Sequence, residues 1–548
     1  MNFFGRSNTT VMSTQGMVSA PSYLASQVAL TVLKQGGNAV ESAIAGAAAM
    51  SVVYPHMNTI GGDNFWLIYN ANTTEIKGLE STGAAGKNVK SDFYHAQGYK
   101  KIPARGYLAV NTVPGAVAGW QAAYNYSQQQ MNGGCKWQDL LQPAIEYAAK
   151  GFPVSANQHQ WLQENLNSTD QEFGNLRRFE GFNSIFFKSN GKPYQSGEIL
   201  RQTDLAETMS RIAKQGGNEF YLGETAKRIV KDLQSHNGLL TLEDFARHKA
   251  RWVEPISVDY RGYKAYNLPP PSQGIASLQI LSILNNFNLQ ELGEGTADYY
   301  HLIIEATKLA FADRDRWVSD PDLIDIPITQ LLSTTHNFNL AQQVNMQITQ
   351  GNSAISLESD TAWLGVVDQD GNAVSFIQSI ADGFGSGIVA QGTGVLLQNR
   401  GKFFSLAPNH VNYLEPNKRT YHTLNPAMLL KQSKPYLVYG TMGGNGQPQT
   451  QAALVTRVVD FGFSAQDAVE SPRWIQGRRL GAPSNELKIE GRVSQSVLEQ
   501  LRQRGHQVSV QPNFTDVMGH AGLIIIDPQT KVRSGGADPR GDGLAVGY

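Results

Sequence analysis

The pattern of apolar and polar positions changes character near residue 360. Upstream of it helical patterns dominate, beginning with an amphipathic helix predicted at residues 22–36 and stopped by Gly36-Gly37. Further helices are predicted at residues 116–126, 137–150, 224–232 and 297–312. Downstream, strands are predicted at residues 361–398, 427–439 and 521–526. One pair of helices is predicted among them, at residues 449–461 and 464–470. Helices combined with apolar strands in this way are typical of a layered α/β sandwich.

Another helix is predicted at residues 40–54, where Ala, Val and Met dominate and Pro55 ends the run. Small residues on all sides of a helix indicate that it is buried, here between a sheet and a layer of helices. A strand at residues 64–69 follows the turn Gly61-Gly62. The N-terminal part of the chain is therefore expected to supply both helices and strands to the sandwich.

The junction at residue 360 carries the first candidate chemistry. A polar stretch at residues 351–360 precedes a strand-like run at 361–368, and Asp370-Gly371 predicts a hairpin turn into a second strand at 373–380. If the chain cuts itself before Thr361, that residue gains a free α-amine that can deprotonate its own hydroxyl nucleophile. An ordinary linker followed by a hairpin shows the same local pattern, so the junction alone leaves both interpretations open.

Composition excludes several classes of protein. The chain has 548 residues, 41% of them hydrophobic and 17% charged, which is ordinary for a globular protein. Lys plus Arg (45) nearly balance Asp plus Glu (46), and this argues against a nucleic-acid or membrane partner. The single cysteine, Cys135, cannot form an internal disulfide. The first ten residues lack an apolar signal core and residues 43–54 are too short to span a bilayer, so we expect a cytoplasmic location.

Glycine clusters are the next signal. Residues 440–446 follow a predicted strand, and a Gly-Gly pair there lets two backbone N–H groups point at one spot, as an oxyanion requires, although a simple turn also explains it. Residues 385–390 imitate a dinucleotide-binding G-x-G-x-x-A, but residues 391–414 contain no Asp or Glu for the ribose. Metal-binding spacings are absent and the 11 histidines are scattered. We therefore expect no cofactor and no metal.

Taken together, these pieces resemble the γ-glutamyltransferase family of N-terminal-nucleophile hydrolases. The matching stretches follow the family's order along almost the whole chain. They are GGNAVESAIA at 36–45, VYPHMNTIGG at 53–62, residues 361–372, GSGIVA at 385–390, Pro426, Gly443-Gly444, Ser471-Pro472-Arg473 and ADPR at 537–540. Each match is short, but the ordered set is specific and favours catalysis at Thr361 over the ordinary linker.

The resemblance implies a four-layer αββα sandwich made as a precursor. Cleavage between Asp360 and Thr361 would yield a large chain of residues 1–360 and a small chain of residues 361–548, packed together as one catalytic domain. Thr361 would be the nucleophile and its α-amine the base. The other residues carried over are Gly443 and Gly444 as the oxyanion hole, Ser379 as a hydrogen-bonding neighbour of Thr361, and His422 and Thr423 where relatives have paired serines.

Departures from the family pattern affect the substrate. Glu80 stands where γ-glutamyl enzymes have an arginine for the substrate's α-carboxylate, and Ala381 and Phe403 stand where they have groups for its α-amino group. Such charge-assisted contacts are worth about 1.5–3 kcal/mol each, so their loss predicts poor selection of γ-glutamyl groups. Arg105 is a candidate replacement for the missing cation, although a structural role is the simpler interpretation. The lid insertion of some members is absent after Ser405.

The chain thus resembles the lidless branch, which includes acylases of glutaryl-type amides and an oxamate amidohydrolase. We expect hydrolysis of a small amide through an acyl-threonine, with the protein's own cleaved chain as its other partner. Two alternatives stay open: a γ-glutamyl hydrolase/transferase acting on glutathione and γ-glutamyl peptides, and an unprocessed, non-catalytic binding homologue. The sequence also leaves the oligomeric state open, a dimer of processed heterodimers included.

Overall fold

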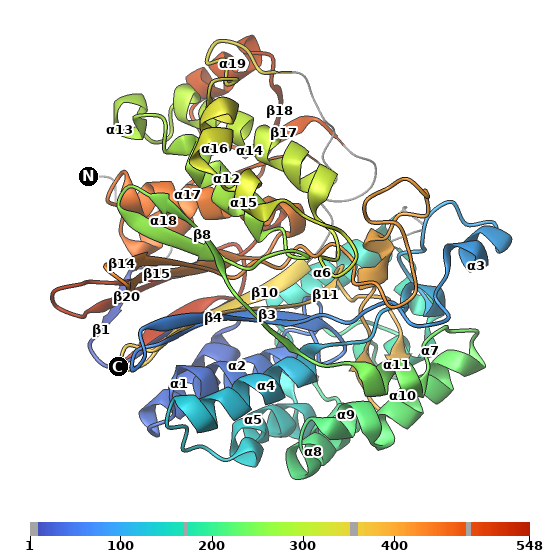
Figure 1. Cartoon of the computed structure of the whole chain (residues 1–548). Coiled ribbons are helices and arrows are strands. Elements are labelled where there is room, and N and C mark those ends of the chain that lie inside the picture. Colours follow the sequence, from blue (N-terminus) through green and yellow to red (C-terminus); the bar gives the residue numbers. More distant parts are fainter. Residues whose placement is uncertain (1–8, 169–173, 351–359, 478–483) are drawn as a thin grey trace.

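Two seven-stranded antiparallel sheets lie face to face between two layers of helices in the computed structural model, which describes residues 9–168, 174–350, 360–477 and 484–548 (Figure 1). Sheet I has the order β21 (Leu544–Gly547), β2 (Met17–Ala20), β10 (Asp360–Val367), β11 (Ala373–Ala381), β3 (Asp63–Asn70), β4 (Glu75–Ser81) and β7 (Arg251–Val253). Sheet II has the order β1 (Val11–Ser13), β20 (Arg533–Ala537), β19 (Ala521–Ile526), β15 (Lys434–Thr441), β14 (Ala427–Lys431), β9 (Tyr263–Asn267) and β8 (Ile256–Tyr260).

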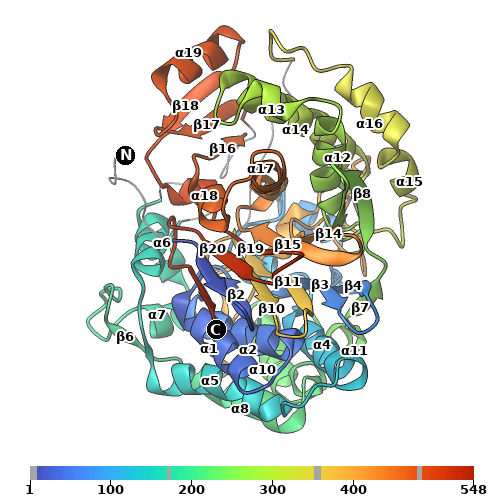
Figure 2. The ribbon, with the colours of Figure 1, turned by 90° about the vertical axis from the view of Figure 1, so that its left-hand side faces the viewer.

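Helices cover the outer face of each sheet, and the view in Figure 2 shows the same stacking from the side. On the side of sheet I, α1 (Tyr23–Lys34), α2 (Ala39–Val53) and α4 (Ala116–Gln130) pack on the strands. Farther from the sheet on that side lie α5 (Trp137–Lys150), which packs on α2, α8 (Thr203–Gln215), which packs on α5, and α10 (Glu224–Ser235). On the side of sheet II, α12 (Gly274–Leu284), α17 (Gln447–Val459) and α18 (Ala465–Glu470) pack on the strands, and α14 (Ala297–Trp317) packs on α12 and α17, with α19 (Gln495–Gln503) against α14. The αββα architecture expected from the sequence is confirmed.

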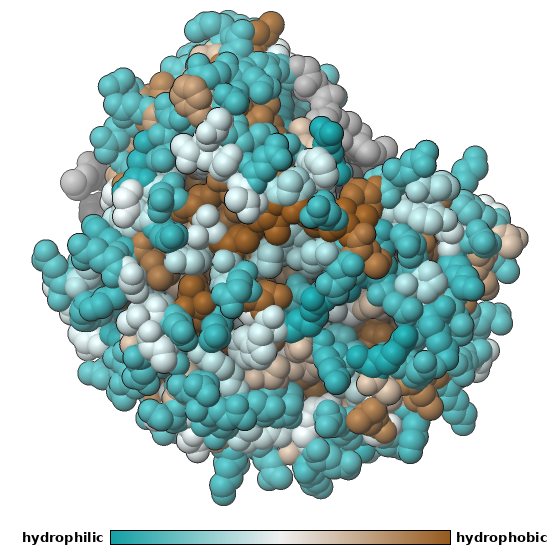
Figure 3. Space-filling view, in the orientation of Figure 1, coloured by the Kyte–Doolittle hydropathy of each residue, from teal (hydrophilic) through white to brown (hydrophobic). Residues whose placement is uncertain are grey.

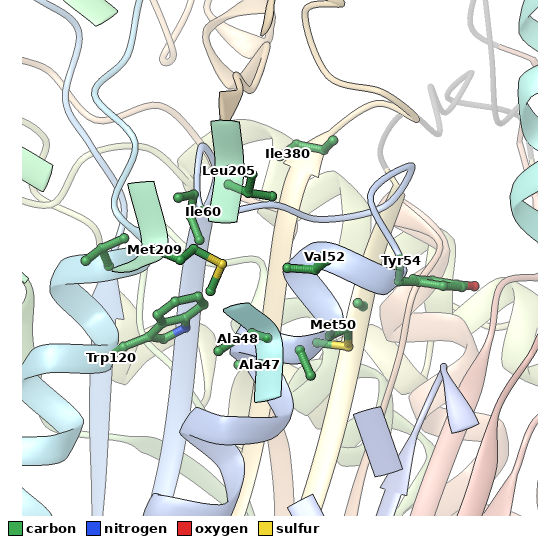
Figure 4. Packing of buried hydrophobic residues seen from close by; sticks show 14 of the residues in the cluster. Ala47, Ala48, Met50, Val52, Tyr54, Ile60, Trp120, Leu205, Met209 and Ile380 are labelled. Carbon is green, nitrogen blue, oxygen red and sulfur yellow. The ribbon is translucent and has the colours of Figure 1, made fainter. Parts of the chain in front are cut away.

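Helix α2 is the buried helix that the small residues at 40–54 predict. All 15 of its residues are buried, and Asn38 caps its first turn in a capping box with Glu41. Small side chains let sheet I and neighbouring helices approach from every side; Figure 4 shows Ala47 and Ala48 among larger side chains such as Trp120. The helix therefore supports the outer face of sheet I.

A separate apolar core fills the space between the two sheets. Trp363 of β10 lies in it, and two glycines of sheet II make room for its indole ring. A Cβ added at Gly440 would lie 2.1 Å from Cδ1 of Trp363, and one added at Gly522 would lie 2.5 Å from Cζ3. This close approach sets the distance between β10 and β15, and hence between Thr361 and the glycine turn that follows β15.

The face shown in Figure 3 is mainly hydrophilic, with apolar side chains gathered in a band across its middle. None of the helices in the described part of the chain is both long and apolar enough to cross a membrane. Residues 351–359, most of the predicted linker, lie outside the described residues.

Candidate active site

Thr361 is the second residue of β10, at the end of the strand where the pairing with β11 is irregular. Asp360 pairs with Ala381 and Ala362 pairs with Gln378, so two residues of β11, Ser379 and Ile380, oppose the single residue Thr361. Bulges of this kind re-aim side chains and are frequent beside active sites. Thr361 is fully buried at this bulge.

The paired glycines belong to the turn that leads into Gln447, a residue whose side chain contacts Thr361. They follow β15, and the helix α17 begins three residues later with Gln447, whose Nε2 lies 3.5 Å from Oγ1 of Thr361. Gly443 has φ +123° and Gly444 has φ +55°, conformations that favour glycine. Within the described residues, neither glycine N–H donates a recorded hydrogen bond. Two backbone donors without a partner in the described part of the chain therefore precede the residue that contacts the predicted nucleophile, and an oxyanion hole requires such donors.

Polar side chains hold this turn from behind. Nε2 of Gln273 donates to the carbonyl oxygens of Gly444 and Thr423, both at 2.8 Å. Oε1 of Gln273 in turn accepts hydrogen bonds from Tyr421 at 2.9 Å and from Arg314 at 3.2 Å. Because every partner is buried or nearly so, the network fixes the glycine turn relative to the segment that carries Thr423.

Ser379 is tied to an arginine that the sequence did not single out. Its Oγ accepts hydrogen bonds from Nη2 of Arg400 at 2.9 Å and from the Ala381 N–H at 2.8 Å. Nη1 of Arg400 donates to Oγ1 of Thr423 at 3.2 Å. Arg400 therefore bridges Ser379 and Thr423, the two predicted hydroxyl groups around Thr361.

Asp63 and His422 form a buried pair beside Arg400. Nε2 of His422 lies 3.3 Å from Oδ2 of Asp63, and Nδ1 of His422 accepts from the Leu424 N–H at 3.2 Å. Burial, together with Arg400, holds the pKa of His422 well below its ordinary value. The imidazole is therefore neutral, with both nitrogens used inside the protein. Burial also raises the pKa of Asp63 to about 7, although Arg400 opposes the shift.

Arg105, the predicted replacement cation, is buried in a different cluster. It donates to Oδ1 of Asn165 at 2.9 Å and to the Gly385 carbonyl oxygen. Asp382 is next to it; burial opposes its ionisation, but Lys402 and Arg105 outweigh burial and lower its pKa. The charge of Arg105 is thus already used to stabilise the protein.

The structure also defines the surroundings of Glu80, Ala381 and Phe403, the three positions that differ from the family pattern. Glu80 is buried and ion-paired with Arg419, and burial raises its pKa to about 7. Ala381 adopts φ +74°, and the Phe403 ring lies under Arg400, with 5.2 Å from the guanidinium carbon to the ring centroid. Neither Ala381 nor Phe403 offers an anion to a substrate ammonium group.

A cavity of about 290 Å³ adjoins this region. Arg419 and Arg251, the partners of Glu80, line it, together with Thr82, whose hydroxyl donates to Oδ2 of Asp63 at 3.3 Å. Thr82 therefore joins the wall of the cavity to Asp63.

One other cluster has the composition of a metal site. His301, Glu305 and His506 place ligand atoms within 4.8 Å of one another. However, the two imidazoles bond to each other at 2.8 Å, and Glu305 binds the Lys308 ammonium at 2.8 Å and Thr349 at 2.6 Å. Because these atoms already satisfy one another around a buried ammonium, the residues present do not fit a cation.

Sequence reasoning missed Arg400, Asp63 and Gln447. Arg400 does carry a signal: it lies three residues after the apolar run at 395–397, within a stretch that contains no acidic residue. Asp63 follows the Gly61-Gly62 turn and opens a buried strand, where a carboxylate is unusual. Gln447 has no distinguishing local pattern.

Comparison with known proteins shows extensive similarity. The family described as Gamma-glutamyltranspeptidase matches residues 25–548. The glutathione hydrolase-like YwrD proenzyme of Bacillus subtilis (strain 168) is 43% identical over 540 residues, covering 98% of this chain and 100% of that protein. The oxamate amidohydrolase proenzyme of Klebsiella pneumoniae is 40% identical over 537 residues, covering 98% and 99%. The crystal structure of cephalosporin acylase from Bacillus halodurans has a TM-score of 0.89 and 35% identity, covering 100% and 98%.

These similarities confirm the family resemblance, the sandwich fold and the self-processing amidohydrolase class expected from the sequence, and the chain is an enzyme of that class. The cleavage point and the individual site residues stay predictions. Because the family match extends over nearly the whole length, the chain belongs to the gamma-glutamyltranspeptidase family.

Proposed function

We propose that the chain cuts itself between Asp360 and Thr361 and then hydrolyses a small amide of the oxamate or glutaryl type through an ester on Thr361. The observation that supports this most directly is the contact of the Thr361 hydroxyl with Gln447 at 3.5 Å, because Gln447 directly follows the turn that carries Gly443 and Gly444. A hydroxyl nucleophile and preorganised donors for an oxyanion are the two essentials of acyl transfer.

Self-cleavage begins with attack of Thr361 Oγ1 on the carbonyl carbon of Asp360. The peptide C–N bond breaks, the amide nitrogen of Thr361 takes up the proton of the hydroxyl, and an ester joins Asp360 to Oγ1. Water then hydrolyses the ester, leaving a carboxylate on Asp360 and a free α-amine and hydroxyl on Thr361. Residues 1–360 and 361–548 become the two chains of one catalytic domain.

In the mature enzyme the α-amine of Thr361 accepts the hydroxyl proton as Oγ1 attacks the substrate amide. Negative charge develops on the carbonyl oxygen, where the N–H groups of Gly443 and Gly444 stabilise it. The C–N bond breaks and the leaving amine takes the proton from the α-ammonium. Water then attacks the ester and releases the carboxylic acid, so Thr361 is regenerated.

The surroundings of the site favour this substrate class over γ-glutamyl compounds. A γ-glutamyl group carries an α-ammonium, yet Ala381 and Phe403 are uncharged and the carboxylate of Asp382 is already paired with Lys402 at 2.6 Å. Oxamate and glutaryl groups carry a carboxylate and no ammonium. Two similar proteins bear the names oxamate amidohydrolase and cephalosporin acylase, and a third is named glutathione hydrolase-like.

Processing tests the proposal directly. The Thr361→Ala variant should remain one uncut, inactive chain on a denaturing gel, and Thr361→Ser should be cut more slowly. Thr393→Ala, which removes another buried threonine hydroxyl, should be processed normally. N-terminal sequencing of the smaller wild-type fragment should read Thr-Ala-Trp-Leu. A cut and active Thr361→Ala protein, or another N-terminus, would refute the assignment.

Substrate class is tested with processed enzyme on oxamate, a glutaryl anilide and a γ-glutamyl anilide. Turnover of either of the first two should exceed that of the third. Preferential turnover of the γ-glutamyl anilide would support the alternative function instead. The cytoplasmic location and a dimer of processed heterodimers also stay proposals, to be checked by fractionation and by light scattering.

A further inference from the structure

Arg400 is a fully buried cation without an ion-pair partner among the described residues. Its terminal nitrogens donate only to the neutral hydroxyls of Ser379 and Thr423, and its Nε has no hydrogen-bond partner in that part of the chain. Burial lowers the pKa of Arg400 to about 10, although Asp63 and Asp382 oppose the shift. A buried guanidinium with an unused donor is costly, and such groups are otherwise paired. An anion from outside the chain would supply the partner that Arg400 lacks.

The position of Arg400 identifies where that anion binds. Nη2 lies 2.9 Å from Oγ of Ser379, and Ser379 is one of the two β11 residues that oppose Thr361 at the bulge. Arg400 therefore binds a residue that lies opposite the predicted nucleophile on the neighbouring strand. A single small substrate can therefore present an anion to this guanidinium and its carbonyl carbon to Thr361.

Neighbouring carboxylates leave the charge of Arg400 incompletely balanced. Asp382 is bound to Lys402 at 2.6 Å and to Nδ2 of Asn399 at 2.6 Å, so its charge is shared with another cation. Asp63 accepts hydrogen bonds from the Gly115 N–H at 3.0 Å and from Gln398 at 3.2 Å, and its raised pKa leaves it partly protonated near neutral pH.

Other cations near the site are engaged. Arg105 donates to Asn165 and Gly385 and stabilises the charge of Asp382. Arg419 is ion-paired with Glu80 and Asp320. Arg314 is ion-paired with Asp315 at 2.6 Å and donates to Gln273. Arg400 alone among these four combines complete burial with an unused Nε–H in the described residues. Its fork of N–H donors also matches a carboxylate in two-point geometry.

We propose that Arg400 is the specificity residue that binds the carboxylate of the substrate's acyl half, with Ser379 and Thr423 holding the guanidinium in place. This inference rests on the proposed function and deepens it, because it selects amides whose acyl group ends in a carboxylate. The Phe403 ring under the guanidinium keeps that face apolar and directs the carboxylate to the donor edge. The same arrangement gives no binding site for a substrate ammonium.

The test compares acidic and neutral amides on processed enzyme. Glutaryl anilide and oxamate are paired with valeryl anilide and oxamide, which lack the carboxylate. Wild type should favour each acidic substrate over its neutral partner by about 10- to 100-fold in kcat/KM, the value of one charge-assisted contact. Arg400→Gln should remove that preference mainly through KM and leave the neutral amides within a few-fold of wild type, while Arg400→Lys should restore part of it.

Arg457→Gln is the matched control, because Arg457 is an equally buried arginine that pairs with Glu294 at 2.8 Å. It should leave the acid-to-neutral ratio unchanged. If Arg400→Gln fails to mature, the wild-type ratio still decides: an enzyme cut at Thr361 that shows no preference for acidic amides overturns the role of Arg400 and leaves the proposed nucleophile standing. Equal losses of Arg400→Gln on acidic and neutral amides would also overturn it. An uncut wild type would instead overturn the proposed function.

Discussion

Nε2 of Gln447 and Oγ1 of Thr361 lie 3.5 Å apart, although 86 positions separate them in the chain. Gln447 opens α17 directly after the glycine turn, so the contact links the predicted nucleophile to the predicted oxyanion hole. Oε1 of Gln447 is buried and has no partner among the described residues. Cleavage before Thr361 creates a new donor, the α-ammonium, within the same small region. The Oε1 of Gln447 is therefore placed to accept a hydrogen bond from the α-ammonium once the chain is cut.

Gln447→Leu should slow both processing and turnover. The loss of one neutral hydrogen bond of about 1 kcal/mol corresponds to a roughly fivefold lower kcat. Gln449→Leu is the control, because Gln449 is also buried on α17 but bonds to Gln476. Rates of cleavage and steady-state kcat should fall only in the first variant. Equal rates in the two variants would show that Gln447 has no part in positioning Thr361.

Gly443→Ala should impair chemistry more than folding. A Cβ at this position meets only the Gly519 Cα at 3.6 Å, but φ +123° is strained for alanine, so the turn and its N–H groups must shift. Loss of one oxyanion donor typically lowers kcat by about 10²- to 10³-fold. Gly462→Ala provides the control, since its φ is also positive (+68°) and its Cβ meets nothing within 4 Å. Comparable kcat values in the two variants would argue against an oxyanion hole here.

The sequence predicted elements whose signal is local. The hairpin of β10 and β11 and the buried helix α2 were expected within one or two residues of their observed ends, because turn chemistry and small-residue composition act over short distances. The hairpin of β8 and β9 was missed within a segment read as mostly helical. Its strands are five residues long and mix charged with apolar positions, and β8 is the edge strand of sheet II, so their pattern is weak.

The site was predictable only in part, because local sequence patterns do not report contacts between distant segments. Thr361 and the glycine pair belong to recognisable motifs, whereas Arg400 owes its role to Ser379 and Thr423, which reach it from β11 and from the segment before β14. Periodicity does not report such contacts. Likewise, the raised pKa of Asp63 arises from burial by segments brought together by the fold.

Binding of carboxylate substrates should weaken as pH rises through about 7. Of the groups that face Arg400, Asp382 is already ionised and Tyr421 stays neutral because burial raises its pKa, while burial places the pKa of Asp63 at about 7. Above that pH ionised Asp63 offsets more of the guanidinium's charge, so the inhibition constant of oxalate should increase between pH 6 and pH 8. Asp63→Asn should keep the low-pH affinity throughout. An unchanged slope in Asp63→Asn would exclude Asp63 as the titrating group.

Gly440→Ala should disturb maturation from within the core. The added methyl would lie 2.1 Å from Cδ1 of Trp363, so β10 must move away from β15, and Thr361 lies only two residues from Trp363. Overpacking of this kind costs about 1–3 kcal/mol, and we expect a lower urea midpoint together with slower cleavage. Trp363→Leu alone leaves a cavity that also destabilises the fold. In the double variant the smaller side chain makes room for the methyl, so its loss of stability should be less than the sum of the two single losses. Strictly additive losses would mean that the contact between Gly440 and Trp363 does not set the spacing of the two sheets at Thr361.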